Sequence, residues 1–332
     1  MILRLIISFA ISFAISVGMA VVIIPVLKRI KVGQTIREDG PVWHNKKQGT
    51  PTMGGVIFIT GVTIVCLTIG ITDMRDGRFG HISVLAFALV FAAIGLFDDY
   101  IKVKKKQNLG LKAYQKFALQ LLIALGFVTV MNLLGNLTTS VYIPFINIFV
   151  PIPVPIYYLF AVCVIVGTVN SVNITDGADG LATGVTIPVT ACIIALAYYW
   201  GHETVGVFSS ALLGGLIAFL IFNFYPAKII MGDTGSLFLG GAICAMAFAM
   251  NIPLLLIVLG FVYFVETLSD IIQVAYFKIS KGKRVFKMAP LHHHFEMSGW
   301  SEYKLFTVFT TVSAIFAVIA YLGVYQRYSL MY

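Results

Sequence analysis

Residues 5–27 read LIISFAISFAISVGMAVVIIPVL, a run of 23 residues without a charged side chain. A helix needs roughly 20 predominantly apolar residues to cross the hydrocarbon core of a bilayer, whereas the apolar region of a signal peptide has about 7–15. No small-residue cleavage site stands before the basic cluster that starts at Lys28. The run therefore predicts a first membrane helix.

The rest of the chain repeats this pattern. Only 11% of the 332 residues are charged and 59% are hydrophobic, whereas soluble domains have about 25% charged residues. This composition excludes a soluble globular enzyme. Because short loops connect the apolar stretches, we predict a single all-α, polytopic membrane domain over residues 1–332. About ten segments are predicted to cross the bilayer as helices, namely residues 3–27, 54–70, 81–97, 117–134, 156–172, 181–199, 207–225, 237–250, 254–277 and 305–325.

The charged residues predict the orientation of these spans. The net charge is +9, and alternating loops place most of the 23 Lys and Arg residues on one face. Only Arg4, Arg75, Arg78 and Arg327 fall on the other face. By the positive-inside rule the basic face is cytoplasmic, so both termini are predicted to be extracytoplasmic. Most of the 14 acidic residues share the basic face, which predicts an active site there.

Two adjacent carboxylates follow the third predicted span. Asp98 and Asp99 stand at the membrane boundary, and Lys102 comes one helical turn later. Adjacent carboxylates raise each other's free energy of ionisation, so they favour a divalent cation or lysines close by. The alternative is a solvated helix end with an ordinary basic stop-transfer cluster.

A second polar cluster ends the fifth predicted span. Asn170, Asn173, Asp176 and Asp179 recur every three residues, so in a continuing helix they would form one polar stripe. Such a stripe is expensive in a membrane unless it faces a cleft filled with water or ligand. Gly177 permits close approach of the backbone to a ligand. The alternative is a seam of hydrogen bonds between helices.

A third cluster, MGDTGS at residues 231–236, precedes the eighth predicted span, and Asn223 comes shortly before it. A carboxylate in a glycine-rich turn that opens a helix can hold Mg²⁺, while the helix N-terminus faces phosphate oxygens. Asp233 is therefore a predicted metal ligand. A simple capping turn would have a similar sequence.

Two further segments add cationic and polar groups. His292, His293 and His294 follow a lysine-rich stretch, but three consecutive histidines cannot all point the same way, so a zinc site made from this run alone is not expected. Imidazoles among lysines can bind phosphate or assist proton transfer; the alternative is a surface cluster. Lys47 and Thr52 lead into the second span and fit either a phosphate-facing loop or a helix start.

Carboxylates that hold a hard cation beside lysines are suited to chemistry on a pyrophosphate. A scaffold embedded in a lipid bilayer implies a lipid-borne partner. Together the motifs resemble the polyprenyl-phosphate N-acetylhexosamine-1-phosphate transferases over essentially the whole chain. Residues 98–102, 170–181 and 231–236 resemble the superfamily. The runs PTMGG at 51–55 and APLHHHFE at 289–296 are similar to its muramoyl-pentapeptide branch.

The resemblance implies Mg²⁺-dependent transfer of phospho-MurNAc-pentapeptide from UDP-MurNAc-pentapeptide to undecaprenyl phosphate, which gives lipid I and UMP. It implies a multi-pass protein of the bacterial cytoplasmic membrane and no nucleic-acid partner, and it leaves open whether the chain forms a homodimer. Two other functions stay open. One is transfer of GlcNAc-1-phosphate from UDP-GlcNAc, and the other is ion-coupled transport, which would favour acids near mid-bilayer and an internal repeat.

The implied roles follow from matching positions. Asp98 and Asp99 resemble the catalytic pair, Asp233 resembles the Mg²⁺ ligand, and Lys102 and Lys116 look like the family's active-site lysines. The implied nucleotide- and substrate-binding residues are Lys47, Thr52, Asn173, Asp176, Gly177, Asp179, Asn223, Gln273, His292 and His293, and His292 is also an implied catalytic residue. In one departure from the family pattern, Ile230 stands where many members have an aromatic residue.

Two points stay open at this level. The sequence does not distinguish a single displacement, with Asp98 as the base, from a double displacement through a phosphorylated aspartate. Glu266 and Asp270 lie one turn apart in the ninth span, where they either line the cleft or bond to neighbouring helices. The proline-containing segment 135–155 is expected to hold a short hairpin. The ninth span is long enough to require a tilt or a kink.

Overall fold

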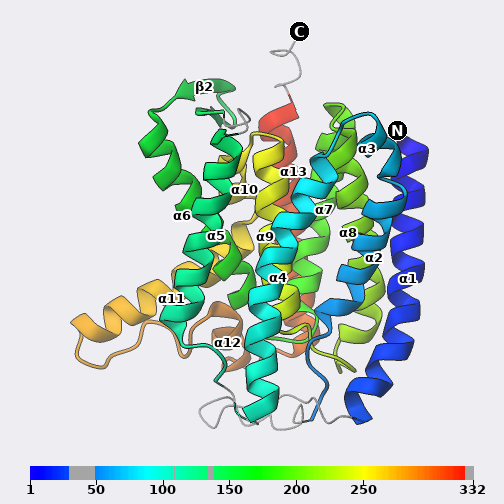
Figure 1. Cartoon of the computed structure of the whole chain (residues 1–332). Helices are drawn as coiled ribbons and strands as arrows, with labels where there is room; N and C mark the ends of the chain where they lie inside the picture. The colour runs from blue at the N-terminus through cyan, green and yellow to red at the C-terminus, as the bar shows by residue number, and fades with distance from the viewer. Residues whose placement is uncertain (30–48, 106, 108, 134–137, 326–332) are drawn as a thin grey trace.

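The structure is a computed structural model that describes residues 1–29, 49–105, 107, 109–133 and 138–325. Eight of its helices are long and apolar enough to cross a membrane, which indicates a multi-pass membrane protein. They pack side by side in one bundle (Figure 1). These helices are α1 (Ile2–Arg29), α4 (Gly80–Lys105), α5 (Ala113–Leu133), α6 (Val154–Thr175), α7 (Leu181–Tyr199), α8 (Glu203–Asn223), α9 (Gly232–Ala249) and α13 (Glu302–Val324).

Two of the ten predicted spans differ from the prediction. Helix α2 (Gly55–Thr68) has 14 residues, about 21 Å of helix, which is shorter than the bilayer core of about 30 Å. The segment predicted as the ninth span is broken into residues Pro253–Leu259, which form η2 (Pro253–Leu255) and α10 (Leu256–Leu259), and α11 (Phe261–Ile279), with a bend of 81°.

The break occurs at Gly260, which stands between the end of α10 and the start of α11. The expected kink is thus confirmed, and it is sharp enough to direct α11 away from the bundle (Figure 1). Helix α12 (Leu291–Glu296) lies beneath the bundle after the loop that follows α11.

The hairpin expected within 135–155 is present. Strands β1 (Ser140–Ile143) and β2 (Ile148–Pro151) pair antiparallel, with Val141 opposite Val150. The backbone N–H of Phe145 in the turn donates to the carbonyl of Gly323 near the end of α13. The hairpin therefore lies at the end of the bundle where α13 ends, which is also where α1 begins (Figure 1).

Helix α9 is the buried centre of the bundle, and glycines allow its neighbours to approach closely. Its apolar side chains from Leu237 to Ile243 are fully buried. A Cβ at Gly55 of α2 would lie 2.2 Å from the Cα of Gly235, and a Cβ at Gly95 of α4 would lie 2.1 Å from the carbonyl oxygen of Asp233. Both distances are far below van der Waals contact, so these two helices reach α9 only because they carry glycine there.

An ion cluster joins the helices at the end of the bundle where α1 begins. Asp73 of the short helix α3 (Ile71–Arg75) is fully buried and pairs with Arg4 of α1 and with Arg78, the latter at 2.8 Å. Arg4 and Arg78 also bind Glu203 of α8, at 2.6 and 3.1 Å. The cluster ties α1, α3 and α8 together on the side opposite the predicted site.

Replacing Asp73 with asparagine is expected to lower the free energy of unfolding by about 3 kcal/mol, because it leaves two arginines without their buried partner. Asp76→Asn is the matched control, since Asp76 pairs only with Arg78 among the described residues and its side chain is 63% exposed. Thermal unfolding of both variants in one detergent measures the effect. Equal melting temperatures would mean that the buried pair does not stabilise this end of the bundle.

Candidate active site

The first carboxylates of the site lie on the last turns of a helix. A loop was predicted from residue 98, but α4 continues to Lys105, so Asp98, Asp99 and Lys102 share one helical surface. The Lys102 ammonium lies 2.6 Å from Asp98 Oδ2 and 3.8 Å from Asp99 Oδ1. The spacings of four and three residues place these groups together, as expected for neighbours on a helix. Both carboxylates are buried.

Asp233 reaches the same place from the first turn of α9. The chain before α9 is fixed by the PTMGG segment: Ile230 N–H donates to the Pro51 carbonyl at 2.8 Å, and Gly54 N–H donates to the Ile230 carbonyl at 2.9 Å. Gly232 then adopts a φ of 73°, which favours glycine. A Cβ there would lie 2.9 Å from the hydroxyl of Thr52, so Thr52 lies directly beside this turn.

Asp99 caps α9. Its carboxylate accepts the backbone N–H groups of Asp233 at 3.2 Å and Thr234 at 2.9 Å, and the Thr234 hydroxyl at 2.7 Å. A carboxylate that accepts the free N–H groups of a helix N-terminus stabilises that terminus. Asp99 therefore fixes the first turn of α9, and with it Asp233, against α4.

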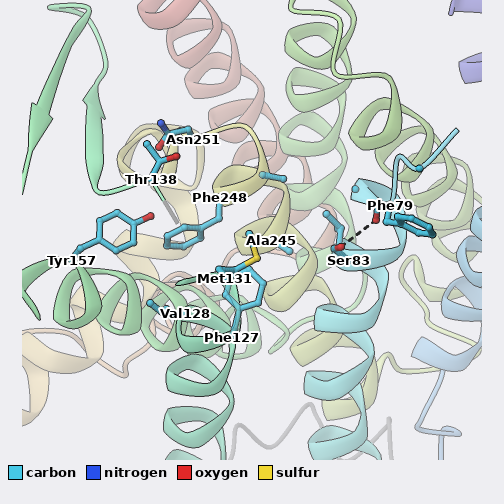
Figure 2. Close-up of a pocket in the computed structure, with 14 residues that line it drawn as sticks. Phe79, Ser83, Phe127, Val128, Met131, Thr138, Tyr157, Ala245, Phe248 and Asn251 are labelled. Atoms are coloured by element: carbon cyan, nitrogen blue, oxygen red, sulfur yellow. Dashed lines mark hydrogen bonds between the residues drawn. The ribbon is translucent and has the colours of Figure 1, made fainter. Parts of the chain in front are cut away.

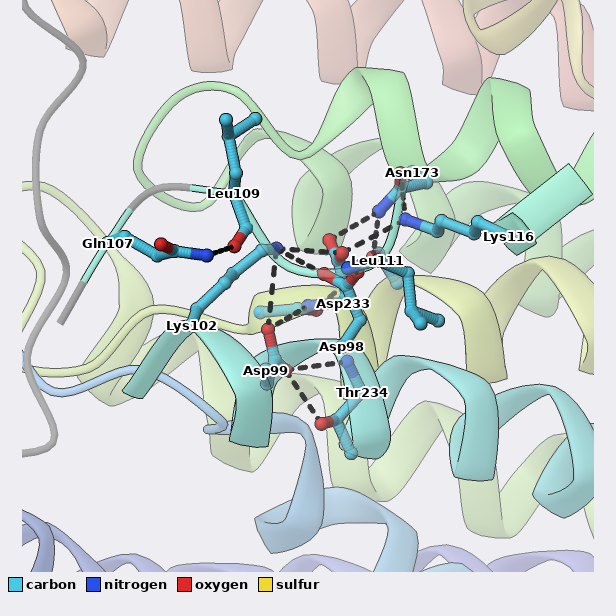
Figure 3. Close-up of polar contacts among 12 residues, drawn as sticks. Asp98, Asp99, Lys102, Gln107, Leu109, Leu111, Lys116, Asn173, Asp233 and Thr234 are labelled. Carbon is cyan, nitrogen blue, oxygen red and sulfur yellow. Dashed lines mark hydrogen bonds and ion pairs between the residues drawn. The ribbon is translucent and has the colours of Figure 1, made fainter. Parts of the chain in front are cut away.

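The Asp233 carboxylate is the centre of the polar network (Figure 3). Its Oδ2 receives the ammonium groups of Lys102 at 2.8 Å and of Lys116 at 2.9 Å, and its Oδ1 accepts from the Asn173 amide at 2.9 Å. The Asn173 amide also donates to Ser236 at 2.7 Å. Lys116 lies on the first turn of α5, not in the loop where it was predicted.

These groups fit a divalent cation. Oxygen atoms of Asp98, Asp99 and Asp233 lie within 4.8 Å of one another, and carboxylate oxygens are the ligands that Mg²⁺ prefers. Three carboxylates face the ammonium groups of Lys102 and Lys116, so one negative charge is not balanced within the cluster. Buried charges are costly when they are not compensated, and an added cation would supply the compensation.

The four residues of the predicted polar stripe do not lie on one helix, because α6 ends at Thr175, before Asp176 and Asp179. Asn170 donates to Gln120 at 2.6 Å, within the bundle, while Asn173 faces Asp233. Asp179 accepts the backbone N–H of Ala227 at 2.9 Å and so connects the turn after α6 to the loop after α8. Burial, together with the negative charges of nearby aspartates, raises the pKa of Asp176 well above its usual range.

Two other predicted binding residues hold loops in place. Asn223 accepts from Thr183 at 2.9 Å and donates to the Ile229 carbonyl at 3.0 Å. Gln273 accepts the backbone N–H groups of Val285 and Phe286, both at 3.0 Å, and donates to the Phe286 carbonyl. Asn223 thus supports the segment that leads to the Asp233 turn, and Gln273 supports the loop between α11 and α12. Lys47 lies outside the described residues.

The three histidines point in different directions, as predicted. His292 bonds to Glu266 at 2.9 Å, and His293 bonds to Glu296 at 2.7 Å. His294 accepts the backbone N–H of Lys287 at 3.1 Å. The ring of His292 lies against Gly177, where a Cβ would be 2.1 Å from Nε2. The structure therefore brings His292 to the turn that follows Asn173.

A cavity of about 480 Å³ lies elsewhere, lined in part by Tyr157, Phe248, Phe127 and Ser83 (Figure 2). Its lining includes Gly77, which follows α3, and Asn251, which follows the C-terminal end of α9, whereas Asp233 lies on the first turn of α9. It contains none of the residues predicted for the site.

Sequence reasoning did not assign Thr234, Ser236 or the partner of His292. Thr234 and Ser236 lie inside the MGDTGS motif, so their proximity to Asp233 in the sequence could have indicated that they belong to the site. Glu266 lies 26 residues before His292, and nothing in its local sequence indicates which group it contacts.

Comparison with known proteins now gives the family. The family model described as "Glycosyl transferase family 4" matches residues 81–251, and "Phospho-N-acetylmuramoyl-pentapeptide-transferase signature 1" matches residues 47–59. The chain is 48% identical to the phospho-N-acetylmuramoyl-pentapeptide-transferase of Clostridium botulinum (strain Alaska E43), over 91% of each chain. It is 46% identical to the proteins of that name in Staphylococcus carnosus and Staphylococcus aureus (strain MSSA476), over 92% of this chain and 94% of theirs. With this identity over nearly its whole length, the chain belongs to the phospho-N-acetylmuramoyl-pentapeptide-transferase family.

Proposed function

We propose that the protein transfers phospho-MurNAc-pentapeptide from UDP-MurNAc-pentapeptide to undecaprenyl phosphate, which forms lipid I and releases UMP. The observation that carries the proposal is the cluster of three aspartates and two lysines at one end of a membrane-spanning bundle. Such a cluster can act on a pyrophosphate while a lipid phosphate reaches it from the bilayer. The family relationship selects the sugar and its carrier.

Asp233 would hold Mg²⁺, with Asp98 beside it. The bound ion would offset negative charge on the pyrophosphate oxygens. Lys102 and Lys116 already touch Asp233, so their ammonium groups are placed to stabilise charge on the departing UMP. These fixed charges do not have to reorganise during the reaction.

Asp98 is assigned as the base. Its Oδ1 accepts the backbone N–H of Leu111 at 2.7 Å and its Oδ2 pairs with Lys102, which fixes the direction of the carboxylate. Asp98 takes the proton of the lipid phosphate, and the phosphate oxygen then attacks the β-phosphorus in a single displacement. Asp99 is less suited to this role, because it caps α9.

The turn after α6 and the His292 segment would bind the nucleotide sugar, with Asn173 and Asp179 holding the turn in place. The four basic residues predicted to be extracytoplasmic include Arg4 and Arg78, which lie at the end of the bundle opposite the aspartates. The protein would therefore span the bacterial cytoplasmic membrane with its aspartate end facing the cytoplasm, on the side of the nucleotide sugar UDP-MurNAc-pentapeptide.

The test is UMP release by the purified protein in lipid nanodiscs. We expect release from UDP-MurNAc-pentapeptide only when Mg²⁺ and a polyprenyl phosphate are both present. In competition, UDP-GlcNAc should neither react nor inhibit at matched concentration. Faster UMP release from UDP-GlcNAc would instead support the sister activity, and no UMP from either donor would contradict both.

A further inference from the structure

Glu266 of α11 is a fully buried carboxylate that the proposed reaction does not use. Its Oε1 accepts the backbone N–H of His292 at 3.1 Å, and its Oε2 lies 2.9 Å from Nδ1 of the same residue. Both side chains are 1% exposed. Among the described residues, the carboxylate has no other hydrogen-bond partner. Glu266 therefore holds both the backbone and the ring of one histidine.

One side of Glu266 is apolar. Val262, Phe295 and Phe309 line a cavity of about 190 Å³ on which Glu266 also borders. Hydrogen bonds are stronger in surroundings of low polarity, and an unpaired charge is correspondingly expensive there. Loss of the bond to Nδ1 would leave the charge of the carboxylate poorly compensated. The contact therefore strongly restrains the orientation of the His292 ring.

The pairing also sets the proton position on the ring. When Glu266 is ionised its carboxylate only accepts hydrogen bonds, so Nδ1 of His292 is then the donor. A second group that binds one ring nitrogen fixes the tautomer and orientation of the imidazole and thereby presents the other nitrogen. Here that other nitrogen is Nε2.

Nε2 of His292 is buried and has no hydrogen-bond partner among the described residues. It lies against Gly177, where a Cβ would be only 2.1 Å away, so the ring approaches this turn so closely only because the residue is glycine. Gly177 belongs to the turn that begins at Asp176, three residues after Asn173, whose amide bonds to Asp233. A buried polar nitrogen without a partner is energetically unfavourable, so a substrate group that bonds to it would offset that cost.

We propose that Glu266 is a positioning residue, which holds His292 so that Nε2 alone faces the bound nucleotide sugar. This inference rests on the proposed function for the identity of the substrate. Glu266 itself does not touch the substrate. It acts through the histidine, and its hydrogen bonds join α11, after the bend at Gly260, to α12.

The test variant is Glu266→Gln, which preserves shape but replaces one acceptor oxygen with a donor. We expect kcat/KM for UDP-MurNAc-pentapeptide to fall about 10–100-fold, as is typical when the partner of a functional histidine is lost. The KM for undecaprenyl phosphate should not change. In a His292→Gln background, Glu266→Gln should cause no further loss, because the carboxylate acts only through the ring. Asp76→Asn removes an exposed carboxylate that pairs with Arg78 at the opposite end of the bundle and should retain parental kinetics.

A second measurement does not depend on the reaction. With ¹⁵N-labelled histidine, the signal absent from the His292→Gln variant identifies His292, and its Nδ1 should resonate as a protonated nitrogen. In Glu266→Gln this signal should move. Unchanged nitrogen signals in Glu266→Gln would overturn the proposal. An equal fall in kcat/KM for both substrates, together with a lowered melting temperature, would also overturn it and leave Glu266 with a purely structural role. If the nitrogen signals move but the parental protein releases no UMP, the proposed function fails and the pairing stands.

Discussion

Replacing Asp233 with asparagine is expected to lower the turnover number by about a thousandfold or more. The substitution removes the charge to which Lys102 and Lys116 both bind and one of the three carboxylates able to hold a cation. Removal of a single preorganised electrostatic group costs about 10²–10³ in rate, and loss of a metal ligand adds to that effect. The Asn173 contact can persist, because an asparagine carbonyl still accepts at the Oδ1 position.

Two measurements test this prediction. UMP release at saturating Mg²⁺ gives the turnover number, and Mn²⁺ binding followed by electron paramagnetic resonance reports the cation site without catalysis. Asp76→Asn is the control, because it removes an exposed carboxylate at the opposite end of the bundle and should leave both quantities unchanged. Near-parental turnover of Asp233→Asn at saturating Mg²⁺ would contradict its assignment as the metal ligand.

Apolar runs were sufficient to predict most of the fold. The segment 181–199 coincides with α7, and most ends of the other long helices were missed by a few residues, but α4 continues to Lys105, eight residues beyond its predicted end. A helix can extend beyond its apolar stretch when polar residues at its end bond to other helices, and Asp99 and Lys102 of α4 bond to the first turn of α9 in this way. The break at Gly260 could not be located, since an uninterrupted apolar run looks the same whether the helix continues or bends.

The site could be predicted as a set of residues, but not as an arrangement. Adjacent carboxylates at a membrane boundary and a carboxylate in a glycine-rich turn are local signals, and they identified Asp98 and Asp233. The different roles of the neighbouring residues Asp98 and Asp99 could not be predicted. Asp99 caps α9, which depends on the packing of α4 against α9, and sequence spacing contains no information about that contact. For the same reason, the partner of His292 could not be predicted.

Gly95→Ala tests whether this packing sets the geometry of the site. The added Cβ would lie 2.1 Å from the carbonyl oxygen of Asp233 and 2.6 Å from the backbone nitrogen of Thr234. Because both atoms belong to the backbone, no side-chain rotation relieves the contact, and the first turn of α9 must move away from α4. We expect the free energy of unfolding to fall by about 1–3 kcal/mol.

The expected loss of activity is larger than the loss of stability. A displacement of about 1 Å at a catalytic group costs roughly 100-fold in rate, and here the displaced turn carries Asp233 while Asp98 stays on α4. Gly126→Ala on α5 is the matched control, since a Cβ there meets nothing within 4 Å and alanine favours a helix. UMP release and thermal unfolding, measured on both variants, separate the two effects. If Gly95→Ala lost activity only in proportion to its unfolded fraction, the contact between α4 and α9 would serve stability alone, and the spacing of the aspartates would have to be set elsewhere.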